Sequence, residues 1–370
     1  MKVLILSCGT GGGHNSAALA VQENLKEKNV EADFVEYLDV INPKIKDSVN
    51  HLYIKTTHGS GKAFKVVYRL GELYQKTKLK SPVYGLNRLN KRKLYQYIVD
   101  HHYDYVVTTH LFAAQTLTAI KKDYPIHFIE IATDYVCIPF WEETNPDYFV
   151  IPSKELEKDF QAKGIEKNKL LPLGIPVKKA YRQDYQKEKS KRNLKLKENK
   201  KYVLILTGSM GFGNVTQMVK ELLEHIKEIV FIIACGNNKE LLETLNNTYK
   251  ESDRIIAIPF TDQISEYMKC SEIILTKPGG LTTTEIANLR KPFIHTMPIP
   301  GCENYNAEFF SQRKMSISCS TMEDVVKNTE ELLKNAELQQ KMIQNQEKYI
   351  SRNTCDEITN IILREIKGRL

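Results

Sequence analysis

Short apolar runs alternate with helical stretches twice along this chain of 370 residues. Each apolar run is the length of a buried strand and is rich in β-branched residues, so it predicts a strand rather than a helix. Strands that alternate with helices form a parallel sheet covered by helices on both faces. Single cores rarely grow past roughly 250 to 300 residues, so a chain of this length suits two of them. The pattern therefore predicts two Rossmann-like α/β domains.

A lysine-rich stretch separates the two series of predicted strands. The first series lies at residues 3–7, 32–37, 105–109, 127–132 and 148–152, with a helix at 16–28 after its first strand. The second lies at 202–207, 230–235, 254–258, 272–276 and 293–296. We expect an N-terminal domain over residues 1–178, a linker over 179–201 and a C-terminal domain over 202–349. A last helix, at about 350–370, is expected to pack back on the N-terminal domain.

Composition excludes several classes of protein. Hydrophobic residues make up 42% of the chain and charged residues 26%, which is ordinary for a soluble globular protein. No apolar run approaches the roughly 18 residues that span a bilayer, and the N-terminal VLIL run leads into glycines rather than a cleavage site. The seven cysteines form no C-x-x-C, so neither a disulfide framework nor a zinc site is indicated. We expect a cytoplasmic protein.

Positive charge is concentrated in residues 51–100. This segment holds eleven Lys or Arg and seven aromatic residues against two acids, a net charge of +9 compared with +8 for the whole chain. Basic residues near an anionic membrane contribute about 1 kcal/mol each, and aromatic rings settle at the headgroup level. A peripheral membrane surface is one interpretation, and a solvated basic face or a nucleic-acid surface are the others.

Ligands of parallel sheets bind at the carboxyl ends of the strands, so the loops that follow strands are the candidate sites. Three of them are rich in glycine: GTGGGHNSAA (9–18), TGSMGFGN (207–214) and TKPGGLTTTE (276–285). In the last, two glycines let a ligand approach the backbone, and the N-terminus of a helix at 281–288 suits a diphosphate. Glu285, about one turn into that helix, is either a ribose ligand or an ordinary exposed glutamate.

The sequence contains no Asp-x-Asp pair that could hold a divalent metal against a nucleotide diphosphate. If a diphosphate is a leaving group, helix N-termini and backbone N–H groups must carry its charge. We therefore expect neither a metal nor a cofactor.

Five motifs in this order and spacing resemble those of the diacylglycerol glycosyltransferases, the family of plant monogalactosyldiacylglycerol synthase and bacterial processive diacylglycerol glucosyltransferases. They are GTGGGHNSAA, ATDY followed by Trp141, LGIPV (173–177), TKPGGLTTTEIA and MPIPGCENYNAEFF (297–310). More distantly, the chain is similar to the enzyme that adds N-acetylglucosamine to the peptidoglycan lipid precursor. The resemblance implies the GT-B fold, in which two Rossmann-like doubly wound domains face each other across a cleft.

The resemblance also implies roles for individual residues, with the nucleotide sugar bound by the C-terminal domain. Gly279, Gly280 and Thr282 fall where the diphosphate is held, and the IPF segment (258–260) where uracil is received. Glu285 matches the acid that contacts ribose, and Glu303 with Asn306 the pair that faces the sugar hydroxyls. The full set expected to bind the donor is Gly208, Ser209, Phe260, Gly279, Gly280, Thr282, Glu285, Glu303 and Asn306.

His14 and Asp134 match positions on the N-terminal side of the predicted cleft, where the acceptor enters. A lone histidine after a glycine loop is more often an ordinary helix-start residue. With the family pattern, His14 becomes the expected general base, and Asp134 its orienting partner or a competing base. The residues expected to contact the lipid acceptor or the membrane are Gly12, Gly13, Lys62, Lys65, Arg69, Arg88 and Arg92.

The resemblance implies an inverting transfer of a hexose from UDP-glucose or UDP-galactose to diacylglycerol or a glycosyl-diacylglycerol. The UDP-sugar is then a substrate, and the protein is peripheral on the inner face of the cell membrane. Two departures stand out. Several relatives place a histidine between the Thr-Asp pair and the tryptophan, where this chain reads DYVCIPFW. Glu303 stands where the peptidoglycan enzyme has glutamine, which argues against an N-acetylated donor.

Other functions remain as alternatives. One is transfer of N-acetylglucosamine to a lipid-linked peptidoglycan precursor. Another is dinucleotide-dependent oxidation, because Gly11-x-Gly13-x-x-Ser16 loosely fits the dinucleotide fingerprint, with Glu36 about 20 residues on. A basic nucleic-acid-binding protein is the third, and no recognised nucleic-acid motif supports it.

Overall fold

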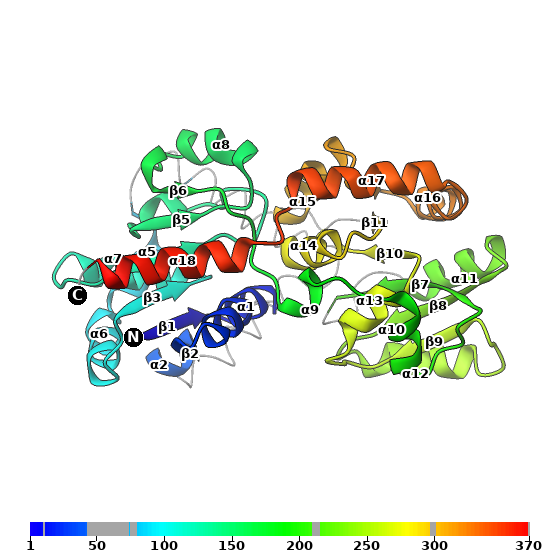
Figure 1. Cartoon of the computed structure of the whole chain (residues 1–370), viewed down its shortest axis with the longest axis horizontal. Coiled ribbons are helices and arrows are strands. Elements are labelled where there is room, and N and C mark those ends of the chain that lie inside the picture. Colours follow the sequence, from blue (N-terminus) through cyan, green and yellow to red (C-terminus); the bar gives the residue numbers. More distant parts are fainter. Residues whose placement is uncertain (10–11, 43–73, 75–79, 209–214, 297–300, 369–370) are drawn as a thin grey trace. The chain divides into compact units, whose positions relative to one another are not determined.

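The structure, a computed structural model, describes residues 1–9, 12–42, 74, 80–208, 215–296 and 301–368. It divides into two compact units (Figure 1). The first consists of residues 1–179, 300–302 and 351–370. The second consists of residues 180–299 and 303–350. The chain therefore leaves the first unit after residue 179, touches it again at 300–302 and returns to it at residue 351.

The first unit is built on six parallel strands in the order β2-β1-β3-β4-β5-β6. The strands are β1 (Lys2–Ser7), β2 (Glu31–Glu36), β3 (Tyr105–Thr108), β4 (Phe128–Ile131), β5 (Tyr148–Val150) and β6 (Leu170–Leu171). Its helices are α1 (Gly13–Glu27), α2 (Tyr37–Ile41), α5 (Pro82–Arg88), α6 (Lys91–Asp100), α7 (Leu111–Lys121), α8 (Glu157–Ala162) and α18 (Thr354–Lys367). Short 3-10 turns lie at η1 (Trp141–Glu143), η2 (Lys154–Leu156) and η3 (Lys167–Lys169).

The second unit repeats this architecture with the order β12-β11-β10-β7-β8-β9, again all parallel. Its strands are β7 (Lys201–Leu206), β8 (Ile229–Ala234), β9 (Ile255–Ile258), β10 (Ile273–Thr276), β11 (Phe293–Thr296) and β12 (Ile317–Cys319). Its helices are α9 (Lys179–Arg182), α10 (Lys187–Asn193), α11 (Val215–His225), α12 (Lys239–Thr248), α13 (Ile264–Cys270), α14 (Gly280–Asn288), α15 (Cys302–Gln312), α16 (Met322–Lys334) and α17 (Ala336–Tyr349).

The predicted α/β class and all ten predicted strands are confirmed, with ends within two residues of those expected. The sequence did not predict β6 and β12, which are edge strands of two and three residues. Runs this short show no periodicity of their own, so only pairing with a neighbouring strand reveals them.

The C-terminal helix α18 packs on α1 and lies along the first unit (Figure 1). Ile358, Ile362 and Ile366 recur every four residues, so they share one face of the helix, and that face is buried in the core of this unit. On α1, the Asn24 side chain accepts a hydrogen bond from the Thr359 hydroxyl at 2.7 Å. The last helix of the chain therefore packs on a sheet whose strand β1 begins at residue 2.

The segment expected to be a linker, residues 179–201, contains α9 and α10. Helix α10 packs on α13, and the Lys191 ammonium group donates to the carbonyl oxygens of Glu198 and Lys200 at 2.8 and 2.9 Å. These contacts explain why residues 180–201 belong to the second unit.

Each sheet has a switch point, where strand order reverses and the loops diverge to leave a crevice at the carboxyl edge. In the first sheet it lies between β1 and β3, so the loop that carries His14 meets the loop after β3. In the second sheet it lies between β7 and β10, so Gly208 and the Lys277–Gly280 loop lie at the same edge. The topology thus brings the glycine-rich loops of each unit to the position where α/β folds bind ligands.

Glu130 is a buried carboxyl group at the middle of β4. One of its oxygens accepts a hydrogen bond from the Thr144 hydroxyl at 2.5 Å, and the other has no partner among the described residues. Burial raises the pKa of Glu130 to about 8. The carboxyl group is therefore protonated in the folded protein at neutral pH, where an unfolded chain would ionise it.

This group makes stability depend on pH. Between its ordinary pKa of 4.5 and its folded pKa of about 8, only the folded state binds the proton, so the free energy of unfolding falls as pH rises. We expect Glu130→Gln to remove this decline, which amounts to at most about 5 kcal/mol across the window, as measured by urea unfolding at several pH values. Glu243→Gln, an exposed control on α12, should leave the slope intact. A Glu130→Gln protein with the wild-type slope would contradict the prediction.

Candidate active site

The loop before α1 is shaped by close contacts of its glycines. Gly12 caps the helix in the left-handed conformation, at φ 79°. A Cβ atom on Gly9 would lie 3.2 Å from Oε2 of Glu36, whose other oxygen accepts from the Gly9 N–H at 3.0 Å. The carboxylate also lies 3.4 Å from the Asn15 amide. The acid that the dinucleotide alternative needs for ribose therefore hydrogen-bonds to the glycine loop instead.

His14 occupies the second position of α1, at the switch point of the first sheet. Its Nδ1 lies 2.7 Å from the backbone carbonyl oxygen of Thr109 and 2.9 Å from the Thr133 hydroxyl. A carbonyl oxygen can only accept, so Nδ1 carries the proton of the neutral ring. The lone pair is then on Nε2. The loops after β1, β3 and β4 thus fix both the tautomer and the orientation of one imidazole ring.

The charge state of His14 is set by opposing effects. Burial lowers its pKa below the ordinary value of 6.5, while the negative charge of Asp134 and the Thr109 hydrogen bond act to raise it. The net direction is down, so the ring is neutral at neutral pH and can accept a proton. Asp134 is half-buried and stabilises the imidazolium that would form. The structure therefore places the two predicted catalytic residues in one electrostatic environment.

His110 is a second histidine beside His14. The two rings meet edge to face with their centroids 4.8 Å apart. At the N-cap of α7, Nδ1 of His110 accepts from the Phe112 N–H at 3.2 Å, so its lone pair is already used. Burial, followed by the charge of His14, holds the pKa of His110 well below 6.5. His110 is therefore a neutral neighbour. It directly follows the strand predicted at residues 105–109, and its contact with His14 was not predicted.

In the second unit, the first turn of α14 lies at the switch point. Gly279 is its N-cap. The Gly279 N–H donates to the Lys277 carbonyl oxygen at 2.9 Å, which closes a tight turn directly before the helix. The first N–H groups of a helix have no partner within it, and the dipole favours an anion there. Thr282 is half-buried in the same turn. Gly208, at φ 78°, follows β7 across the switch point.

Glu285 and Asn306 are both buried. The charge of Glu285, together with the larger effect of burial, raises the pKa of the Tyr181 hydroxyl, so Glu285 is not an ordinary exposed glutamate. The amide of Asn306 donates to the carbonyl oxygen of Pro278 at 2.9 Å. This contact holds the turn before α14, and complete burial does not fit the predicted contact of Asn306 with sugar hydroxyls. Glu303, one turn earlier on α15, is half-buried.

Lys277 was not among the residues predicted to bind the donor. It follows β10 directly, inside the TKPGG motif, and is half-buried. Burial lowers its pKa to about 8, and the nearby charge of Glu303 partly opposes that shift. An ammonium group in this environment would gain from an added negative charge. It could have been recognised in the sequence as the only cation of the TKPGGLTTTE motif.

Most of the remaining predicted residues are exposed or lie outside the described part of the chain. Phe260 follows β9 with 62% of its side chain exposed. Gly13 begins α1. On α5 and α6, Arg88 and Arg92 are exposed. The predicted residues that fall outside the described part are Ser209, Lys62, Lys65 and Arg69.

Two further observations concern the whole described chain. Its residues include no cluster of three or more His, Cys, Asp or Glu that could hold a metal ion. Among the helices of the same residues, none has the length and apolar character to cross a membrane.

Two family models match successive parts of the chain. The model for monogalactosyldiacylglycerol (MGDG) synthase matches residues 14–177. The model for the glycosyltransferase family 28 C-terminal domain matches residues 202–356. The first match begins at His14 and the second contains the α14 loop.

Similar proteins span nearly the whole length. A Bacillus pumilus protein named processive diacylglycerol beta-glucosyltransferase is 26% identical over 98% of this chain and 95% of its own. The crystal structure of Acinetobacter baumannii MurG matches with a TM-score of 0.64 and 15% identity, covering 98% of this chain and 99% of its own. The S. aureus MnaA structure with UDP matches with a TM-score of 0.64 and 16% identity, covering 99% and 97%. The predicted GT-B fold is confirmed by this likeness.

Proposed function

The chain is a relative of the diacylglycerol glycosyltransferases, with an MGDG synthase domain followed by a family 28 C-terminal domain, and we propose that it transfers a hexose from a UDP-sugar to diacylglycerol. The geometry of His14 is the observation that carries this proposal. Its Nδ1 proton is engaged by the Thr109 carbonyl oxygen, and its Nε2 lone pair is at the carboxyl edge of the first sheet. Such a ring suits a general base for an acceptor hydroxyl.

The reaction is a single displacement with inversion. The Nε2 lone pair of His14 takes the proton of the acceptor hydroxyl while the hydroxyl oxygen bonds to the anomeric carbon of the sugar. The bond from that carbon to the β-phosphate oxygen breaks on the opposite face, and UDP leaves with the electron pair. Asp134 stabilises the imidazolium until the proton is released to solvent.

The second unit supplies the charge that stabilises UDP as it leaves. We assign this role to the N–H groups of the first turn of α14 and to the Lys277 ammonium group, with the Asn306 amide holding the turn. Glu285 is the proposed ribose ligand, and Glu303 the ligand of the sugar hydroxyls. Because the sequence has no Asp-x-Asp pair, the proposed reaction needs no divalent metal and no other cofactor.

The proposed membrane surface is on the first unit, and its partner is the anionic inner face of the cell membrane. Leu86 and Leu89 are 67% and 74% exposed at the C-terminal end of α5. Arg88 and Arg92 are exposed in the same stretch. Apolar side chains flanked by cations suit an anionic lipid surface, where a diacylglycerol acceptor would be presented.

The test is transfer from a panel of UDP-sugars to diacylglycerol in vesicles, with products identified by mass, linkage and anomeric configuration. We expect UDP-glucose or UDP-galactose to give a product of inverted configuration, in EDTA as well as without it. Added anionic lipid should raise the rate, and salt should reverse the increase. A retained configuration, or a reaction abolished by EDTA, would contradict the mechanism. Thermal stabilisation by NAD and not by UDP would contradict the function itself.

A further inference from the structure

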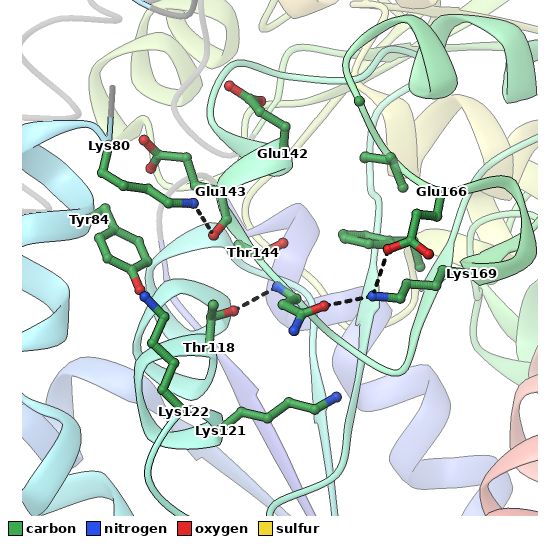
Figure 2. Close-up of a pocket in the computed structure, with 14 residues that line it drawn as sticks. Lys80, Tyr84, Thr118, Lys121, Lys122, Glu142, Glu143, Thr144, Glu166 and Lys169 are labelled. Atoms are coloured by element: carbon green, nitrogen blue, oxygen red, sulfur yellow. Dashed lines mark hydrogen bonds and ion pairs between the residues drawn. The ribbon is translucent and has the colours of Figure 1, made fainter. Parts of the chain in front are cut away.

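A cavity of about 430 Å³ lies in the first unit (Figure 2). Its walls include the C-terminal end of α7 and the segments that lead into β5 and β6. These segments precede their strands, whereas His14, Thr109 and Thr133 follow theirs. In a parallel sheet the two sets of loops lie at opposite edges. The cavity is therefore separate from the candidate active site.

Four lysines line this cavity, and two of them have a carboxylate partner. The Lys121 ammonium group lies 2.7 Å from Oδ1 of Asp147. The Lys169 ammonium group lies 3.4 Å from Oε1 of Glu166. The ammonium groups of these two residues are thus neutralised within the protein.

The other two, Lys80 and Lys122, form no ion pair among the described residues. Their ammonium groups lie 5.0 and 5.6 Å from the centre of the same ring, that of Tyr84. Lys80 donates to the backbone carbonyl oxygen of Glu143 at 3.0 Å. Burial lowers the pKa of Lys80. The negative charges of Glu143 and Glu142 act against this shift, and the positive charge of Lys122 adds to it. Two ammonium groups therefore lie near one ring, and their positive charges repel each other.

The nearest buried carboxylate is held by other groups. Glu143 accepts hydrogen bonds from the Ser81 hydroxyl and the Gln115 amide, both at 2.7 Å, and from the Ser81 N–H. Ser81 in turn caps α5 by accepting from the Tyr84 N–H at 3.1 Å. This network fixes the backbone at residue 81, next to Lys80. Lys80 therefore directly precedes a residue whose backbone is held by this network, and Lys122 directly follows the last residue of α7.

We propose that this cavity binds a phosphate ester, with its phosphate group bound by the ammonium groups of Lys80 and Lys122. A phosphate accepts hydrogen bonds from ammonium groups and would reduce the repulsion between these two positive charges. The lining also contains Glu142, Glu166 and Asn145, whose side-chain oxygens accept hydrogen bonds, and the two carboxylates disfavour further negative charge. They suit hydroxyl groups on the ester.

The volume of the cavity is in the range of small-molecule sites. Glycerol phosphate, free or as a phospholipid headgroup, has this chemistry.

The test compares binding by wild type with that by Lys80→Gln/Lys122→Gln, using glycerol phosphate as the probe and thermal stabilisation as the readout. We expect saturable stabilisation of the wild type beyond that given by NaCl of equal ionic strength, and an apparent Kd at least about tenfold higher in the double variant. The single variant Lys122→Gln should show a smaller loss. The control is Lys154→Gln/Lys158→Gln, which removes the same charge from exposed positions of this unit outside the cavity.

Vesicles separate the two sources of the phosphate ester. If the ligand is a lipid headgroup, binding to phosphatidylcholine vesicles that contain phosphatidylglycerol should weaken in the double variant more than in the control. If it is a soluble ester, only the glycerol phosphate response should change. Equal stabilisation of the wild type and the double variant, or none beyond NaCl in the wild type, would overturn the site. These readouts measure binding, so they do not depend on the transfer reaction.

Discussion

His14→Ala is expected to lower kcat for transfer to diacylglycerol by about 10²- to 10⁴-fold, the range found when a general base is removed. The imidazole is held by Thr109 and Thr133 with its lone pair on Nε2, and alanine offers no replacement for it. Because the UDP-sugar is assigned to the second unit, stabilisation by UDP should persist in the variant. Initial rates with UDP-sugar and vesicle-bound diacylglycerol give kcat, and thermal unfolding with UDP gives the binding control.

The pH profile separates a base from a structural histidine. The pKa of His14 is lowered by burial, so the acid limb of kcat/KM in the wild type should lie below 6.5. Asp134 acts to raise that pKa, so Asp134→Asn should move the limb to still lower pH. His101→Ala, an exposed histidine of the same unit, serves as the matched control. Near-normal turnover by His14→Ala, with a severe loss in Asp134→Asn, would assign the base to Asp134.

Much of the fold follows from local patterns in the sequence. The interior strands are continuous apolar runs such as Ile229–Ala234, which is buried at every position, and each carries its own signal. The sequence also located the glycine-rich loops, because glycines and turn residues are visible without a structure. The edge strands β6 and β12 have no such signal. Their existence depends on pairing with β5 and β11.

The candidate sites depend on contacts between residues distant in sequence. His14 receives its tautomer from the Thr109 carbonyl oxygen, 95 residues away, and has a second contact with the Thr133 hydroxyl. Asn306 was expected to face a sugar, and its contact with Pro278 appears only once α15 packs beside the α14 loop. Residue types therefore identify which groups can do chemistry. Strand order decides which of them meet.

Lys277→Met is the second substitution with a large expected effect, a loss of about 10²-fold in kcat. The ammonium group is half-buried beside the first turn of α14, where charge on the leaving diphosphate would develop. A charged donor in a partly dehydrated site stabilises such charge far more than one in water, and removing one donor of this kind typically costs 10²- to 10³-fold. Methionine keeps much of the length and apolar stem, so the loss reports the charge. Steady-state rates with UDP-sugar measure it.

The pattern across related variants distinguishes this role from a structural one. Lys277→Arg keeps the charge and should recover part of the rate, whereas Lys327→Met, an exposed lysine on α16, should leave it unchanged. Because the diphosphate is present before and after transfer, Lys277→Met should also weaken stabilisation by UDP. If Lys277→Met kept both the wild-type rate and the wild-type response to UDP, the backbone N–H groups of α14 would suffice for the leaving group. If Lys277→Arg were no better than Lys277→Met, the shape of the lysine and not its charge would be required.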